Sequence, residues 1–169
     1  MEFIEQFKTK TYFSCSALFD GEQTYVARCV DIYDGDTLTV IIKVDTNFYK
    51  IKIRIYGIDT CEIKSHNVTN KQNAIIARDR LFELLTNQPP PANSSRTQIR
   101  TILNKDDNIC LVTLISHGTD KYGRLLCDVL TLDTKLSVAQ CLLNEKLAYP
   151  YFGKTKKSEE TQETLINNN

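Results

Sequence analysis

Hydrophobic and polar residues alternate through much of the first half of the chain, which is typical of strands with one buried face. In the segment 37–44, every second residue is Leu, Val or Ile. In 50–55, isoleucines alternate with two lysines and Arg54, so the arginine is expected on the face opposite the core. Further strands are predicted at 24–33, 108–116 and 124–132.

The period changes from two to that of a helix in two later segments. Residues 71–86 carry apolar side chains at helical spacing, and "LSVAQCLLNEKLA" (136–148) predicts a second helix with Ser137 as N-cap and Gln140 completing a capping box. The three prolines of 87–96 end the first helix and indicate a surface loop.

The predicted order is three strands, helix, two strands, helix. This order favours an α+β fold, mainly β with helices, in which a five-stranded barrel of the OB type carries two packed helices. A chain of 169 residues fits one such domain. We expect it to span 23–153, with a poorly determined extension at 1–22 and a solvated polar tail at 154–169.

Composition limits the possible partners. Lys+Arg and Asp+Glu both number 21, so a polyanion must be attracted by a local patch rather than by net charge. No apolar run approaches the roughly 20 residues of a membrane span, and the first residues are too polar for a signal peptide. We therefore expect an intracellular protein. Its six cysteines include no C-x-x-C pair, which favours buried thiols over zinc ligands.

Three polar clusters lie at predicted strand ends: "DGDT" (34–37), "RIYGIDTCE" (54–62) and "TDKYGR" (119–124). Each cluster alone is more often a polar turn, and Asp59 and Glu62 could simply cap a following segment. If the strands close into a barrel, however, the three ends can converge, and we interpret them together.

The converging residues predict a chemistry. Carboxylates such as Asp36 and Asp59 suit a hard divalent cation, and two arginines, Arg54 and Arg124, suit a phosphate because guanidinium groups match its oxygens. A further carboxylate, Glu62, can orient or deprotonate water. The set predicts metal-assisted hydrolysis of a phosphodiester.

The ordered motifs, from residue 25 to about 151, resemble the staphylococcal nuclease (thermonuclease) family. The resemblance implies an OB-fold barrel and calcium-dependent cleavage of DNA and RNA that leaves 5′-hydroxyl and 3′-phosphate ends. Calcium follows from the resemblance alone, whereas the ligand chemistry also admits magnesium or manganese. The implied partner is nucleic acid, with single-stranded DNA or RNA favoured, and no membrane or obligate protein partner is evident.

The resemblance also implies roles for individual residues. Asp36, Asp59 and the backbone carbonyl of Thr60 match the calcium ligands, and Glu62 matches the general base. Cys61 departs from the family pattern, which has proline at this position, so the loop between Asp59 and Glu62 is expected to be less rigid.

The remaining matches concern the substrate. Arg54 and Arg124 match the phosphate clamp, and Lys121 and Tyr122 match contacts to a neighbouring phosphate. Tyr151, together with Tyr149, falls where the family has an aromatic ring beside the nucleobase.

Two other functions compete with a nuclease. A catalytically silent nuclease-like domain would bind nucleic acid or a protein partner, but such domains typically lose an arginine or a carboxylate that this chain retains. A plain OB-fold binding module would carry exposed aromatic residues on its strands and a basic groove. The predicted strand faces here carry mostly Lys, Thr and Arg, and the chain has no Trp.

Overall fold

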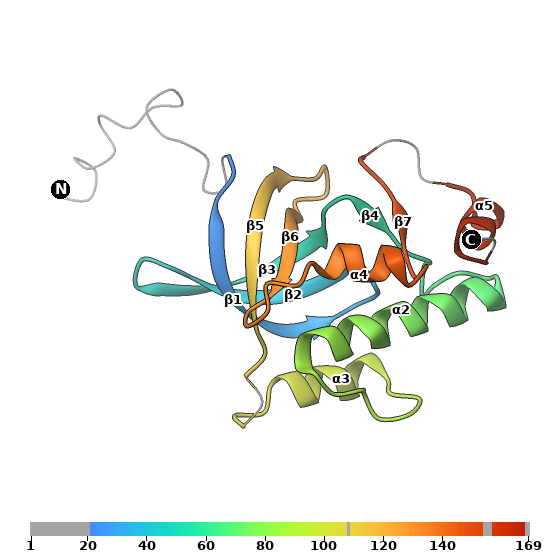
Figure 1. Ribbon diagram of the computed structural model, residues 1–169. Helices are drawn as coiled ribbons and strands as arrows, with labels where there is room; N and C mark the ends of the chain where they lie inside the picture. The colour runs from blue at the N-terminus through green and yellow to red at the C-terminus, as the bar shows by residue number, and fades with distance from the viewer. Residues whose placement is uncertain (1–20, 108, 154–156, 168–169) are drawn as a thin grey trace.

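Five strands form a closed barrel in the computed structural model, which describes residues 21–107, 109–153 and 157–167 (Figure 1). Around the barrel the order is β1-β2-β3-β6-β5, and all neighbours are antiparallel except β3 and β6. The strands are β1 (Thr24–Ile32), β2 (Thr37–Val44), β3 (Asn47–Ile55), β5 (Leu111–Thr119) and β6 (Leu125–Thr131). The predicted α+β barrel is thus confirmed.

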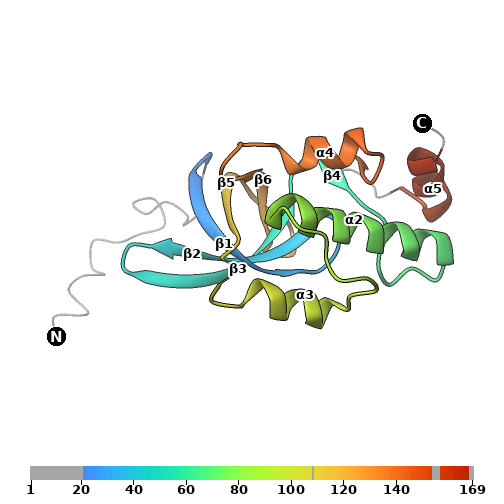
Figure 2. The ribbon, with the colours of Figure 1, turned by 60° about the horizontal axis from the view of Figure 1, so that its bottom comes forward.

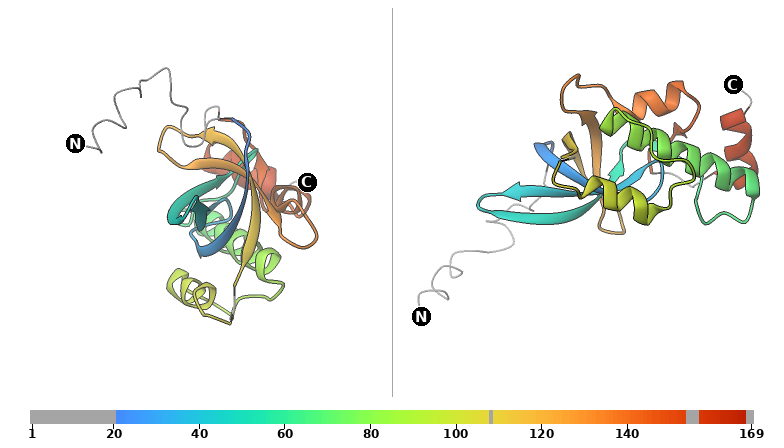
Figure 3. Two further views of the ribbon diagram at one scale, coloured as in Figure 1. Left: turned by 90° about the vertical axis from the view of Figure 1, so that its left-hand side faces the viewer. Right: turned by 90° about the horizontal axis from the view of Figure 1, so that it is seen from below.

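The helices are α2 (Val68–Thr86), α3 (Arg96–Leu103), α4 (Val138–Asn144) and α5 (Glu159–Asn167). In the view of Figure 1, α2 and α3 lie below the barrel, α4 crosses in front of it, and α5 lies to the right. Figure 2 shows α2 between α4 and α3, and both views of Figure 3 place α2 and α3 on the same side of the strands. Two short strands, β4 (Ile58–Asp59) and β7 (Tyr149–Pro150), pair beside the barrel. No helix in the described ranges has the length and apolarity that crossing a bilayer requires.

The alternating residues bury the face that the sequence predicted. Leu38, Val40 and Ile42 of β2 and Ile53 and Ile55 of β3 all lie in the core. A two-residue turn joins β2 to β3, since Val44 pairs with Asn47 and Asp45 takes the left-handed conformation with φ 52°. The turn sets the register, and the register directs Arg54 away from the core.

The number of helices differs from the prediction. Helix α3 follows directly on the proline loop, where none was expected. Ser95 caps it in a complete capping box with Gln98, and Ile99 and Leu103 bury its apolar face. The sequence contains the signal for this helix: a serine with a glutamine three residues later, and two apolar residues four apart. The prolines just before it favoured a loop instead.

The end of the chain contains a helix that the sequence did not predict. The tail was predicted to be solvated, yet 159–167 form α5, which contacts α2 and β7 and buries Gln162. The predicted extension at 1–22 lies almost entirely outside the described residues, as does Cys15. The five described cysteines are free thiols, and all but Cys141 are buried.

A buried carboxylate connects α3 to the barrel. Asp31 of β1 accepts hydrogen bonds from Arg96 Nε at 3.2 Å, from Arg96 Nη2 at 2.5 Å and from Arg100 Nη2 at 2.8 Å. Burial works to raise the pKa of Asp31, but the hydrogen bonds from both arginines outweigh it and hold the pKa below its ordinary value.

Replacing Asp31 with asparagine should therefore lower the free energy of unfolding at pH 7 by about 1–2 kcal/mol, since charged hydrogen bonds are lost and the arginines are partly screened by solvent. Because the folded-state pKa is depressed, this stabilisation is complete well above pH 4 and is lost as the pH falls through that pKa. Urea unfolding of both proteins at pH 7 and pH 3 measures it. A difference of equal size at both pH values would contradict the assignment.

Candidate functional site

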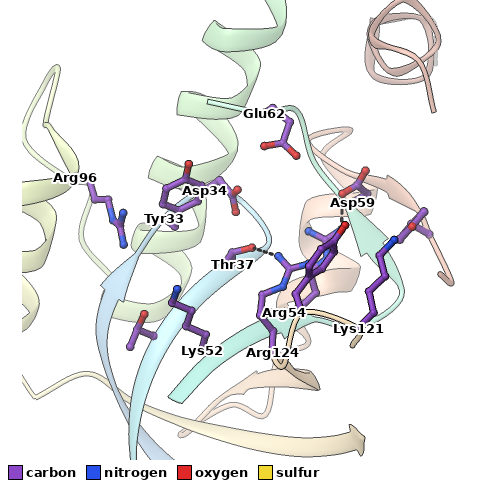
Figure 4. Close-up of a pocket in the computed structure, with 13 residues that line it drawn as sticks. Tyr33, Asp34, Thr37, Lys52, Arg54, Asp59, Glu62, Arg96, Lys121 and Arg124 are labelled. Atoms are coloured by element: carbon purple, nitrogen blue, oxygen red, sulfur yellow. Dashed lines mark hydrogen bonds and ion pairs between the residues drawn. The ribbon is translucent and has the colours of Figure 1, made fainter. Parts of the chain in front are cut away.

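A pocket of about 690 Å³ opens where β2, β3 and the turn before β6 come together (Figure 4). Seven of the ten residues predicted from the sequence line it, namely Arg54, Asp59, Glu62, Lys121, Tyr122, Arg124 and Tyr151. The other three, Asp36, Thr60 and Tyr149, are buried behind its wall. Closure of the barrel thus brings the three polar clusters to one place, as expected.

Arg54 is the central charged group of the pocket. Its side chain is 11% exposed and forms ion pairs with Asp36 and Asp59, each 2% exposed. Two carboxylates buried this deeply need a counter-charge, because unpaired buried charges are costly. Burial alone would lower the pKa of Arg54, but the two carboxylates raise it above its ordinary value, so the guanidinium stays protonated.

Local structure brings these three residues together. In the β2–β3 register, Thr37 pairs with Arg54, which puts Asp36 beside the guanidinium. The chain then turns at Gly57, with φ 79°, so that Asp59 returns to the same guanidinium.

The "DGDT" turn packs tightly against its neighbours. Asp36 Oδ2 accepts hydrogen bonds from the Thr60 backbone N–H at 2.9 Å and from its hydroxyl at 3.2 Å. A Cβ on Gly35 would lie 2.6 Å from the Cβ of Ala77 and 2.9 Å from Thr60 Cγ2. Gly35 is therefore required for close approach to α2 rather than for an unusual φ.

Asp34 also lines the pocket, although the sequence analysis quoted it within "DGDT" and gave it no role. Burial raises the pKa of Asp34 to about 8, and the negative charges of Asp36 and Glu62 add to the shift. The backbone N–H of Asp36 donates to Asp34 Oδ1 at 3.2 Å. Asp34 therefore keeps its proton to a higher pH than an exposed aspartate does.

Tyr149 does not have the position that the sequence suggested. Instead of lying beside a nucleobase, its ring is 2% exposed, and its hydroxyl donates a hydrogen bond to Asp59 Oδ2. Pairing of β4 with β7 sets Asp59 opposite Tyr149. Burial, followed by this hydrogen bond, raises the pKa of the tyrosine. Tyr149 therefore positions Asp59, and of these two tyrosines only Tyr151 lines the pocket.

The second arginine is held by a residue that the sequence analysis had not singled out. Asp120 accepts a hydrogen bond from Arg124 Nε at 2.7 Å and from the backbone N–H groups of Tyr122 and Arg124 at 2.9 Å. Burial opposes these bonds, but they hold the pKa of Asp120 below its usual range. Arg124 Nη1 also donates to Thr37 Oγ1 at 3.4 Å, which directs the guanidinium into the pocket (Figure 4).

Aromatic rings and Glu62 complete the wall. The ring of Tyr122 is 71% exposed and lies 5.6 Å from the guanidinium carbon of Arg124, and the Tyr151 ring lies 5.8 Å from that of Arg54. Asp59 and Glu62 do not cap α2, because Asn67 does so by accepting from the Asn70 N–H at 3.1 Å.

The loop that carries Glu62 is held in place without proline. The Cys61 thiol is buried and donates to Asn70 Oδ1 of α2 at 3.5 Å. Cys61 also packs against Ala74 of the same helix. Tertiary contacts thus hold the loop that the sequence suggested would be less rigid.

No protein-family model matches the chain, and no curated protein matches it. The geometry of the pocket and the motifs themselves are therefore the observations that bear on function.

The pocket suits a divalent cation in donor type and charge. Asp34, Asp36 and Asp59 carry carboxylate oxygens, which hard cations prefer. A cation beside Asp34 would favour its charged form, which burial and the charges of Asp36 and Glu62 disfavour. The N–H and hydroxyl of Thr60 are both used by Asp36. Within the described ranges, no group of three or more His, Cys, Asp or Glu side chains is already arranged as a metal site.

Replacing Asp34 with asparagine should stabilise the metal-free protein. Because the folded-state pKa is raised to about 8, the folded state retains its proton to higher pH, and stability falls as the pH rises from about 4 to 8. Asparagine keeps the acceptor for the Asp36 N–H without the charge. In EDTA at pH 8, thermal unfolding should show a gain of about 1–3 kcal/mol that disappears below pH 4. A variant less stable than the original at pH 8 would overturn this account.

Proposed function

We propose that the protein is a divalent-metal-dependent nuclease that hydrolyses phosphodiester bonds of DNA or RNA, preferably single-stranded, with little sequence preference. The observation that carries this proposal is that two guanidinium groups, those of Arg54 and Arg124, share one pocket with Glu62 and a cluster of buried aspartates. The resemblance of the motifs to the thermonuclease family supports the same reaction, with 5′-hydroxyl and 3′-phosphate products.

The arginines serve as the phosphate clamp. A guanidinium fork matches two phosphate oxygens, and in a partly enclosed pocket it stabilises the negative charge that develops during hydrolysis. Lys121 adds a cation at the same wall. The exposed Tyr122 ring and the Tyr151 ring offer faces on which any base can stack, which suits an enzyme indifferent to sequence.

Glu62 acts on the attacking water. Its carboxylate lines the pocket together with both arginines. It can therefore orient a water and accept its proton while the bond between phosphorus and the 5′ oxygen breaks. Asp36 and Asp59, with Asp34, would hold calcium or another hard divalent cation, which supplies positive charge beside the reacting phosphate. Tyr149 and Thr60 hold these aspartates in position.

One observation favours a second candidate, a silent domain that binds nucleic acid without cutting it. Arg54 is engaged by both Asp36 and Asp59, so these carboxylates already have a counter-charge. If that pairing persists in the presence of metal, the pocket would retain affinity for phosphate but lack a cation.

Arg124 offers the cleaner test of the clamp, because removing Arg54 would also leave two buried carboxylates unpaired and lower stability. Arg124→Ala should reduce kcat/KM by about 10²–10³-fold while the protein stays folded. Labelled single-stranded DNA and a matching RNA would be incubated with calcium, magnesium or EDTA. Arg80→Ala is the matched control, since Arg80 forms ion pairs with Glu83 and Glu145 and does not line the pocket.

Calcium-dependent cutting by the original protein and by the Arg80 variant, but not by the Arg124 variant, would support both the activity and its site. Full activity in the Arg124 variant would show that Arg124 is not part of the phosphate clamp. Tight binding without cutting under every metal would favour the silent domain.

Glu62→Gln separates the base from the ion ligands. The substitution keeps the size of the side chain but removes its ability to accept a proton, so kcat should fall while calcium affinity is largely retained. Calorimetric titration of calcium beside single-turnover kinetics measures both. If calcium affinity is lost instead, Glu62 belongs among the ion ligands.

A further inference from the structure

A second groove, of about 840 Å³, runs beside the pocket between α3 and strands β1 to β3. We call it the α3 groove. It shares Thr39, Lys52 and Arg96 with the pocket, so the two hollows are continuous. In Figure 4, Arg96 and Lys52 lie at the side of the pocket opposite Lys121, with Arg54 and Arg124 between them. A chain leaving the pocket past Arg96 enters the α3 groove.

The α3 groove is strongly cationic, although the chain as a whole has no net charge. Its charged lining residues are Lys50, Lys52, Arg96, Arg100 and Lys105, with Asp31 as the one carboxylate among them. None of the three lysines forms an ion pair with any carboxylate in the described part of the chain. Positive charge concentrated in this way attracts polyanions.

The two arginines of the groove bind Asp31, but this single carboxylate does not neutralise both of their charges. Both bind Asp31, so two guanidiniums face a single carboxylate and are held in fixed positions. The polar groups of Thr101 and Asn104 donate to backbone carbonyls of the protein. Most of the charged groups that face the groove are cations, and cations in a groove beside a phosphate pocket suit further phosphates.

We propose that the α3 groove binds backbone phosphates of the same nucleic-acid strand that occupies the pocket, several nucleotides from the bond to be cut. The proposal rests on the proposed function, because it needs a phosphodiester in the pocket. At the junction, the guanidinium carbon of Arg96 lies 4.6 Å from the centre of the Tyr33 ring, which lines the pocket, so the ring helps to hold this shared cation in place. The preferred substrate is then a single strand longer than the pocket alone can hold.

The test compares strand lengths in a charge-reversed groove. Lys50→Glu/Lys105→Glu changes two exposed lysines that line the α3 groove and not the pocket. Lys71→Glu, on the exposed surface of α2 and outside both hollows, is the control. Affinities for fluorescent oligothymidylates of three and twenty nucleotides are measured in EDTA over a range of salt concentrations.

The original protein should bind the twenty-nucleotide strand at least tenfold more tightly than the three-nucleotide one. The double variant should lose most of that ratio, and its slope of log affinity against log salt for the long strand should fall by about 1.4, the value for two phosphate contacts to a single strand. The Lys71 variant should keep the ratio. An unchanged ratio in the double variant, or an equal loss in both variants, would overturn the α3 groove as a binding site.

Cleavage of the same strands in calcium separates this inference from the proposed function. If both lengths are cut but binding does not depend on length, the proposed nuclease activity is supported and the α3 groove is overturned as a binding site. Length-dependent binding without cutting would support the groove and count against the nuclease. No binding in EDTA together with no cutting in calcium, at either length, would overturn both. If the charge reversal lowers the melting temperature, Lys50→Ala/Lys105→Ala replaces it, with the same ratio as the readout.

Discussion

The rest of the site depends on the paired burial of Asp36 and Asp59 against Arg54. Neither carboxylate could be held 2% exposed without a counter-charge, and the arginine in turn has its pKa raised by both. This one guanidinium connects β3, the turn after β1 and the short strand β4. Well-packed apolar residues in place of a buried ion triad are often equally stable, so chemistry at the pocket explains this arrangement better than stability does.

Each group around this triad is held by a further residue. Tyr149 donates a hydrogen bond to Asp59, and Thr60 donates one to Asp36. Asp120 accepts a hydrogen bond from Arg124. Such support keeps charged groups oriented before a ligand arrives, which is the condition under which electrostatic stabilisation is most effective. Asp34 is the exception, because burial raises its pKa and the negative charges of Asp36 and Glu62 raise it further. In the proposed nuclease, the fixed arginines would bind a phosphate and the carboxylates would bind a metal ion.

Helix α3 extends this electrostatic pattern beyond the pocket. Asp31 fixes Arg96 and Arg100 on the barrel, and the lysines of β3 face the same groove. The equal numbers of acidic and basic residues in the chain give no sign of this arrangement. A ligand responds to the local distribution of charge and not to the net charge.

The sequence by itself determined the five barrel strands, two of the four described helices and the face that Arg54 occupies, because alternation and helical spacing depend on residues only a few positions apart. It also predicted that the three polar motifs meet. Helix α3 was predictable from Ser95, Gln98 and the spacing of its apolar residues, but the prolines before it were given more weight.

Only the tertiary structure decided the rest. The burial of Tyr149, the pairing of one arginine with two aspartates, the raised pKa of Asp34 and the α3 groove all arise where segments distant in sequence come together. Burial and charge balance are properties of those contacts, and no local pattern of residues encodes them.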